Sequence, residues 1–120
     1  MTLFELFTGK FMFPGRSNNH LLKLMMQTKG KISGKMIKKG AFAEQHFNLA
    51  TNQFMQHEPL LEGAVNINAV PIPQVPSKPI LNQLRETVGI DKLDAREVSM
   101  FAEFLDKCTC IDPQKRITAD

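Results

Sequence analysis

The first eight residues constrain the fold more than any other stretch of the chain. A helix over residues 1–8 carries large apolar side chains in nearly every direction around its axis: Leu3, Phe4, Leu6 and Phe7. A helix that is apolar on all sides is normally buried on all sides. We therefore expect the chain to open inside a hydrophobic core, which is an unusual start for an independent domain because no preceding residues cover the helix.

Three further helices are expected from apolar spacing and from capping residues. Ser17 and Asp94 are good N-caps, and Glu97 stands where a capping box has its glutamate. Gly30 and Gly89 are suited to end the helices that precede them. The predicted helices cover about residues 17–29, 77–88 and 94–110.

The middle of the chain lacks a sustained helical or strand period. Five of the seven prolines fall within 48–79, and we expect a long irregular insert there, with one short extended segment at 64–70. Residues 30–40 are expected to form a lysine-rich loop held by a few apolar anchors. The predicted fold class is mainly α, with about four helices and the insert between the second and the third.

Composition excludes several classes of protein. The chain has 120 residues, 42% of them hydrophobic and 22% charged, which is ordinary for a globular protein. No apolar run approaches the span of a bilayer, so a membrane partner is not expected. The only cysteines, Cys108 and Cys110, are poorly spaced for a bridge within a helix and are typical of a reducing, intracellular compartment.

The charge is unevenly distributed. Residues 1–40 hold eight basic side chains and one acidic, whereas residues 41–120 hold seven basic and eleven acidic. Such a basic half is typical of a solvated or partner-facing surface. Candidate partner-docking residues are Lys31, Lys35, Lys38 and Lys39. Because no aromatic residues alternate with these lysines, a stacking platform for single-stranded nucleic acid is missing, and the sequence argues against direct nucleic-acid binding.

No residue pattern predicts catalysis or metal binding. The glycine-rich stretch at 30–36 is one residue short of a phosphate-binding loop and ends in Met36 where a hydroxyl is needed. The histidines and cysteines lack the paired spacing of a structural zinc site, and Cys108 falls on the apolar stripe of its helix. We therefore assign no catalytic, cofactor-binding or metal-binding residue to this chain.

Several short motifs, in their order along the chain, resemble the C-terminal lobe of a eukaryotic serine/threonine protein kinase. They are Leu3-Phe4-Glu5-Leu6-Phe7-Thr8-Gly9-Lys10, Phe13-Pro14-Gly15, Asn18-Asn19-His20 and Asp112-Pro113 with Lys115-Arg116-Ile117. The Phe-Pro-Gly turn followed by a long insert resembles the CMGC group. Within that group the most specific similarity is to the pre-mRNA-processing factor four kinases of the spliceosome, carried by Lys29-Gly30-Lys31, the stretch at 35–42 and Gln45-His46-Phe47.

This resemblance implies a partial kinase domain over residues 1–120, consisting of the C-terminal lobe only and cut at both ends. Residues 48–78, which match no pattern, correspond to the insert of the CMGC group. The resemblance gives structural roles to Phe13, Pro14 and Gly15 in one turn, and to Asp112, Pro113 and Arg116 near the end. In such kinases the arginine forms a buried ion pair with the glutamate of an Ala-Pro-Glu motif. That motif is absent here, so Arg116 is expected to turn to solvent or to pair with Glu5 or Asp112.

The implied function is that of a serine/threonine kinase fragment, a phosphotransferase in the intact protein. The family uses ATP and Mg²⁺, but this chain lacks the glycine-rich loop, the His-Arg-Asp and the Asp-Phe-Gly motifs. We expect it to be inactive alone and to carry substrate-docking helices. Expected partners are the remainder of the kinase domain and protein substrates such as splicing factors, in the nucleus. The alternatives are a non-catalytic basic protein-binding module and a small all-α nucleic-acid binder.

Overall fold

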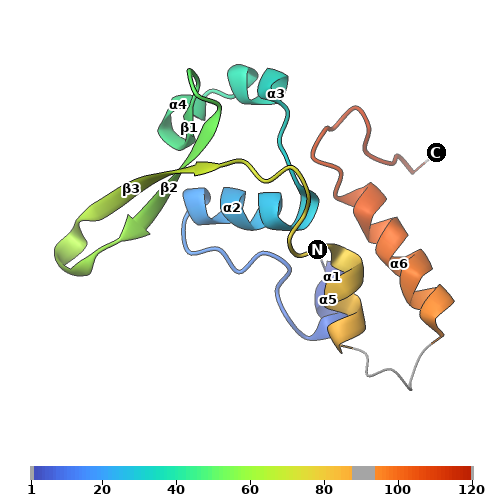
Figure 1. Ribbon diagram of the computed structural model, residues 1–120. Helices are drawn as coiled ribbons and strands as arrows, with labels where there is room; N and C mark the ends of the chain where they lie inside the picture. Colours follow the sequence, from blue (N-terminus) through green and yellow to red (C-terminus); the bar gives the residue numbers. More distant parts are fainter. Residues whose placement is uncertain (1, 88–93, 120) are drawn as a thin grey trace.

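The computed structural model describes residues 2–87 and 94–119, which form six α-helices and a three-stranded sheet (Figure 1). The helices are α1 (Thr2–Thr8), α2 (Asn18–Lys29), α3 (Gly34–Lys39), α4 (Ala43–His46), α5 (Ile80–Thr87) and α6 (Ala95–Cys108). The strands are β1 (Phe47–Asn48), β2 (Gln53–Pro59) and β3 (Val65–Pro71), and a short 3-10 turn at Leu61–Gly63 joins β2 to β3.

The predicted mainly α fold is wrong, because the chain has a mixed α/β fold. The stretch expected to be an irregular insert forms an antiparallel sheet in the order β1-β2-β3. In its long hairpin, His57 of β2 pairs with Ile67 of β3, and Gln53 pairs with Pro71. The extended segment expected at 64–70 corresponds to β3, but its partner β2 was not anticipated.

The sheet forms despite the prolines because they stand at the margins of its strands. Pro59 and Pro71 are the last residues of β2 and β3, where a missing amide proton costs least. Tight turns close the connections: Asn48 Oδ1 accepts hydrogen bonds from two amides of the turn after β1, and Asn52 and Gly63 have positive φ angles of 53° and 79°. The strands are therefore bounded by local turn chemistry.

The predicted N-caps Ser17 and Asp94 are confirmed, but among the described residues Glu97 makes no hydrogen bond that would complete the predicted capping box. The Ser17 side chain accepts a hydrogen bond from the His20 amide at 3.1 Å, and Asp94 accepts one from the Arg96 amide at 3.0 Å. Gly30 ends α2 with a φ of 82°. The loop expected at 30–40 is wrong in part, since Ser33 caps the short helix α3. The predicted stop at Gly89 lies outside the described residues.

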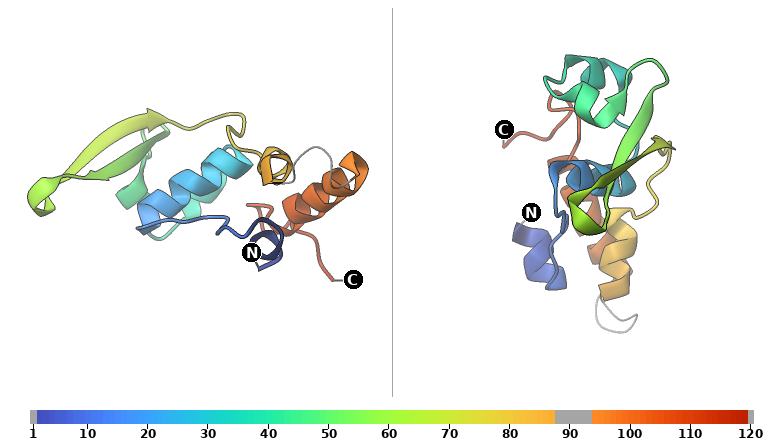
Figure 2. Two further views of the ribbon diagram at one scale, coloured as in Figure 1. Left: turned by 90° about the horizontal axis from the view of Figure 1, so that it is seen from below. Right: turned by 90° about the vertical axis from the view of Figure 1, so that its left-hand side faces the viewer.

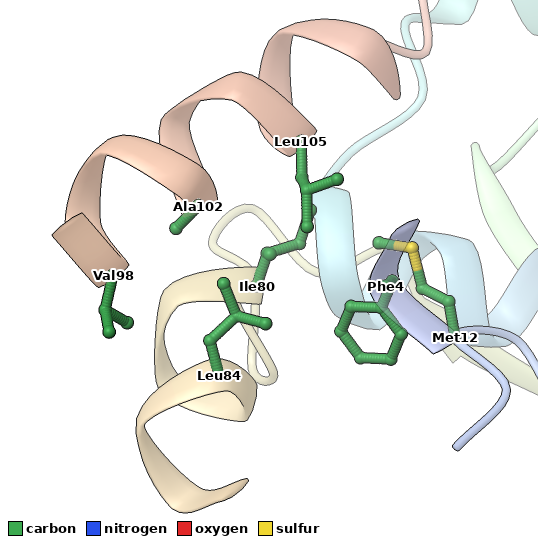
Figure 3. Close-up of a cluster of buried hydrophobic side chains, with 7 residues drawn as sticks. All are labelled: Phe4, Met12, Ile80, Leu84, Val98, Ala102 and Leu105. Carbon is green, nitrogen blue, oxygen red and sulfur yellow. The ribbon is translucent and has the colours of Figure 1, made fainter. Parts of the chain in front are cut away.

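Two hydrophobic clusters hold the chain together. The first joins α1, α5 and α6 through seven buried side chains (Figure 3): Phe4, Met12, Ile80, Leu84, Val98, Ala102 and Leu105. The second joins α2, α3 and the sheet through five: Met26, Ile37, Phe47, Phe54 and Ile72. Figure 1 and the left-hand view of Figure 2 show α2 between the two ends, with the β2–β3 hairpin projecting away from α1, α5 and α6.

The opening helix is only partly covered. Phe4 is buried, but Leu3 and Leu6 of the same helix are 49% and 77% exposed, and Phe11 after it is 69% exposed. The expectation that α1 is buried on all sides is therefore wrong for the chain in this structure. Its apolar surface remains open toward solvent on one side.

Candidate functional site

The candidate site is a groove of about 660 Å³ between α2, the α3–α4 segment and the residues that follow α6. Its lining is mostly aliphatic, aromatic and thioether side chains. The main apolar contributors are Leu21, Leu22 and Met25 of α2, Ile32, Met36, Ile37 and Phe42 around α3, and Phe13 and Ile111. Leu22 and Met25 are half-buried, and Phe42 is 68% exposed, so these side chains face an open groove. Such a surface is suited to an apolar segment of a partner.

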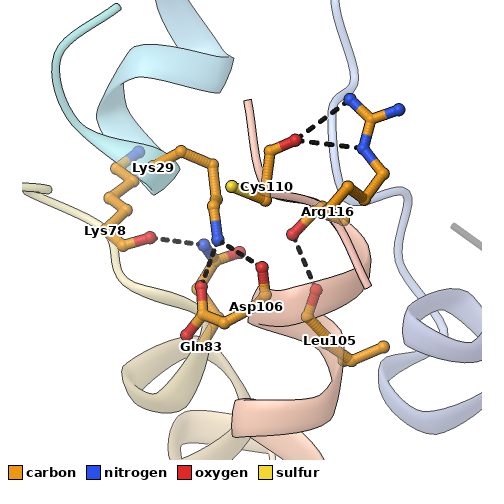
Figure 4. A network of polar contacts seen from close by, with 8 residues as sticks. Lys29, Lys78, Gln83, Leu105, Asp106, Cys110 and Arg116 are labelled. Carbon is orange, nitrogen blue, oxygen red and sulfur yellow. Dashed lines mark hydrogen bonds and ion pairs between the residues drawn. The ribbon is translucent and has the colours of Figure 1, made fainter. Parts of the chain in front are cut away.

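One lysine of the groove is already paired. The Lys29 ammonium of α2 forms an ion pair with the Asp106 carboxylate of α6 and donates to the Asp106 carbonyl at 3.0 Å (Figure 4). Its side chain is only 12% exposed, against 46% for Asp106. Beside this pair, the Lys78 amide donates to the Gln27 carbonyl at 2.9 Å. These contacts attach α2 to α6 and to the start of α5, and thereby fix one end of the groove.

Arg116 supplies a cation at the edge of the same groove. Its Nε and Nη2 donate to the Cys110 carbonyl at 3.1 and 3.0 Å, and the residue is exposed (Figure 4). No ion pair involves Arg116 within residues 2–87 and 94–119, so of the two expected outcomes the side chain takes the solvent-facing one. Its Nη1 group makes no hydrogen bond to the described residues and remains available to a carboxylate.

The other predicted structural residues shape two turns beside the groove. Asp112 Oδ1 accepts from the Gln114 amide at 3.0 Å, in a turn that also contains the exposed Pro113. In the second turn, the Gly15 amide donates to the Phe13 carbonyl at 2.8 Å. A Cβ atom at Gly15 would lie 2.5 Å from the side chain of Leu21, which lines the groove.

A side chain at position 15 would therefore require Leu21 to move. Pro14, beside it, is exposed, whereas Phe13 is half-buried and lines the groove.

The four predicted docking lysines do not line the groove. Lys31 precedes α3, and Lys35, Lys38 and Lys39 lie on it, all four exposed to solvent. Met36 and Ile37 of the same helix face the groove, so the structure places these lysines at its border and Arg116 at its edge. Their arrangement makes the border basic.

A part-buried polar cluster that the sequence did not indicate borders the groove, which His46 lines. Asn19 of α2 is 3% exposed, and its amide nitrogen is 2.9 Å from His46 Nδ1 and donates to the Met55 carbonyl at 2.9 Å. Its amide oxygen accepts from the His57 backbone amide at 2.9 Å. Burial, and secondarily the nearby His57, lower the pKa of His46 from its ordinary value. The partners are far apart in sequence, so no local pattern signals the cluster.

The described part of the chain offers neither a metal site nor a membrane-spanning helix. In that part, no group of three or more histidine, cysteine or acidic side chains is arranged to hold a metal ion. Cys108 and Cys110 carry free, half-buried thiols. Of the helices described, none has the length and apolar character needed to cross a membrane.

The curated relatives of this chain include two serine/threonine kinases, while no protein-family model matches the chain. It is 38% identical over 117 residues to the serine/threonine-protein kinase prpf4B of Dictyostelium discoideum. It is 36% identical over 121 residues to the serine/threonine-protein kinase prp4 of Schizosaccharomyces pombe. Each match covers 97% of this chain, but the chain spans only 14% and 24% of the two relatives.

Proposed function

This chain matches a fragment of the PRP4-type serine/threonine protein kinases, and from that relation we propose that it forms part of a kinase C-terminal lobe that docks other polypeptide segments. The proposed domain covers residues 1–120, with residues 48–78 as the CMGC-type insert. In the intact protein the activity is ATP-dependent phosphorylation of serine and threonine in protein substrates. Splicing factors in the nucleus are the proposed substrates.

The groove is the observation that carries this proposal. It combines an apolar lining with Arg116 at its edge, whose Nη1 group can still donate hydrogen bonds because only Nε and Nη2 bond the Cys110 carbonyl. An apolar segment with a carboxylate fits both features, because a charge-assisted hydrogen bond to arginine is strongest where water is excluded. The proposed occupant is the rest of the kinase domain. It would include the glutamate of the Ala-Pro-Glu motif, which the resemblance gives as the ion-pair partner of Arg116.

We further propose that the 120-residue chain transfers no phosphate alone. Phosphoryl transfer depends on positioned metal ligands, a catalytic aspartate and a phosphate clamp, and the sequence contains none of the kinase motifs that supply them. Calorimetric titration of the purified chain with ATP and Mg²⁺ tests this directly. We expect no binding heat, and saturable binding of ATP would contradict the proposal.

The C-terminal-lobe assignment is tested by a chimera. Residues 1–120 replace the matching segment of the Schizosaccharomyces pombe kinase, and phosphorylation of a generic basic protein substrate is measured. We expect an active chimera, and a tenfold or greater loss when it carries Arg116→Ala, which corresponds to about 1.4 kcal/mol or more. The neighbouring exposed Lys115→Ala is the matched control and should retain activity. A chimera that melts cooperatively but is inactive would contradict the assignment.

The alternative of a basic protein-binding module is favoured by one observation, the four exposed lysines before and on α3. It predicts that the isolated chain binds an acidic peptide with an affinity that falls steeply with salt. The kinase-fragment proposal instead predicts that groove substitutions matter more than lysine substitutions. The phosphorylation activity of chimeras carrying Met25→Glu or Lys38→Glu separates the two proposals. A larger loss with Met25→Glu favours the kinase fragment, and a larger loss with Lys38→Glu favours the basic binding module.

A further inference from the structure

The side chain of Asn19 takes the place of a strand beside β2. Strand β1 pairs only with Gln53 and Phe54, so the same edge of β2 has no strand partner farther along among the described residues. There the Asn19 amide donates to the Met55 carbonyl and accepts from the His57 amide, both at 2.9 Å. One side chain of α2 thus satisfies the two backbone groups that a neighbouring strand would have satisfied.

These two backbone contacts fix the orientation of the Asn19 amide. The Met55 carbonyl only accepts and the His57 backbone amide only donates, so the nitrogen of Asn19 must face Met55 and its oxygen must face His57. The same nitrogen lies 2.9 Å from His46 Nδ1. His46 Nδ1 must therefore be the acceptor, which means that the neutral ring carries its proton on Nε2.

We propose that His46 is a proton-sensitive lock that joins α2 to the β2–β3 hairpin. Protonation places a hydrogen on Nδ1, which then faces the NH₂ group of Asn19, donor against donor. A half-turn of the Asn19 amide group would present its oxygen to protonated His46 and so restore that contact. The same turn would place the oxygen against the Met55 carbonyl and the NH₂ group against the His57 amide, so both hydrogen bonds to β2 would be lost. The charged ring therefore forces either His46 or Asn19 away, and the edge of β2 loses its attachment to α2.

The surroundings of His46 offer its positive charge no compensation. The charged or titratable groups on the elements that contact His46, or that share the groove with it, are His20, Lys23 and Lys29 of α2, Lys35, Lys38 and Lys39 of α3, His57 and Glu58 of β2, and Cys110 and Arg116. Glu58 accepts hydrogen bonds from Gln56 and Asn68, and Glu44 on α4 itself is exposed. Within the described residues no carboxylate forms an ion pair with His46.

The sign of the pH effect follows from the neutral state of the locked ring. Burial and His57 lower the pKa of His46 in the folded chain, so the unfolded chain binds the proton more readily. The contribution of the lock to stability is then complete above the ordinary histidine pKa of about 6.5 and is lost as the pH falls toward the lowered value. The projecting hairpin is the element expected to loosen first.

Hydrogen exchange of the His57 backbone amide in the 120-residue chain tests the lock. After correction for intrinsic exchange, we expect its protection to fall between about pH 7.5 and about pH 5, a range that spans the histidine pKa. His46→Asn keeps an acceptor near the Nδ1 position but does not titrate, and should abolish this fall. His20→Asn is the matched control, since His20 Nδ1 also accepts an amide hydrogen bond, from Arg16, and it should behave as the unaltered chain.

A second variant should reverse the direction in which protection of the His57 amide changes with pH. In Asn19→Asp one carboxylate oxygen opposes the Met55 carbonyl, which lowers the protection at every pH. The carboxylate nevertheless accepts from the His57 amide and, once His46 is protonated, from that ring, so protection of the His57 amide should rise as the pH falls. Equal pH dependence in the unaltered chain and in His46→Asn would overturn the proposal. So would an unaltered chain in which protection of His57 does not depend on pH.

Discussion

Replacing Asn19 by alanine is expected to destabilise the chain by about 2 to 6 kcal/mol, because it leaves two backbone groups without partners. The side chain is 3% exposed and bonds the Met55 carbonyl and the His57 amide, both at 2.9 Å. A part-buried donor or acceptor that loses its partner costs about 1 to 3 kcal/mol, and two are lost here. This is a large fraction of the roughly 5 to 15 kcal/mol typical of a domain.

Urea unfolding followed by circular dichroism measures this difference. The matched control is Asn18→Ala, because Asn18 is the preceding residue of the same helix but is exposed. Both substitutions change helix propensity equally, so the difference between them isolates the contacts with β2. Equal unfolding free energies, within about 0.5 kcal/mol, would refute the reasoning that Asn19 substitutes for a strand.

Two further predictions concern a turn and a surface pair. Gly15→Ala should lower the free energy of unfolding by about 1 to 3 kcal/mol, because the added methyl group overpacks against Leu21. Gly34→Ala is the control and should be neutral or stabilising, because a Cβ atom there meets nothing within 4 Å. Thermal unfolding compares the two variants, and equal melting temperatures would contradict the prediction. The hydrogen bond and the charge of Lys107 lower the pKa of Glu103, so Lys107→Met should raise that pKa toward its ordinary value in an NMR titration, and an unchanged titration curve would show that Lys107 is not the cause.

The helices and their caps could be predicted because their signals are local. Ser17 and Asp94 accept hydrogen bonds from amides two or three residues away, so a short stretch of sequence contains both partners. The sheet could not be predicted in the same way. Ile67 on the edge strand β3 is 53% exposed, and its strand shows little of the burial that makes an alternating pattern visible.

The groove and the lock depend on contacts between distant parts of the chain. Apolar spacing predicts a helix over about residues 17–29, but a periodic pattern does not say whether the chain itself or a partner covers the apolar face, and Leu22 and Met25 line an open groove. Asn19 meets His46 and His57 across 27 and 38 residues, with no motif between them. Arg116 was singled out from its motif, and the structure adds that it is exposed and bonded to the Cys110 carbonyl.

Side-chain footprinting with hydroxyl radicals tests most directly the central claim that the groove receives other parts of a kinase domain. Met25 and Met36 line the groove, whereas Met100 of α6 is 61% exposed and lies outside it. We predict that oxidation of Met25 and Met36 is rapid in the 120-residue chain and strongly reduced in the kinase chimera, while oxidation of Met100 is unchanged. Equal oxidation of Met25 and Met36 in the two proteins would contradict the account.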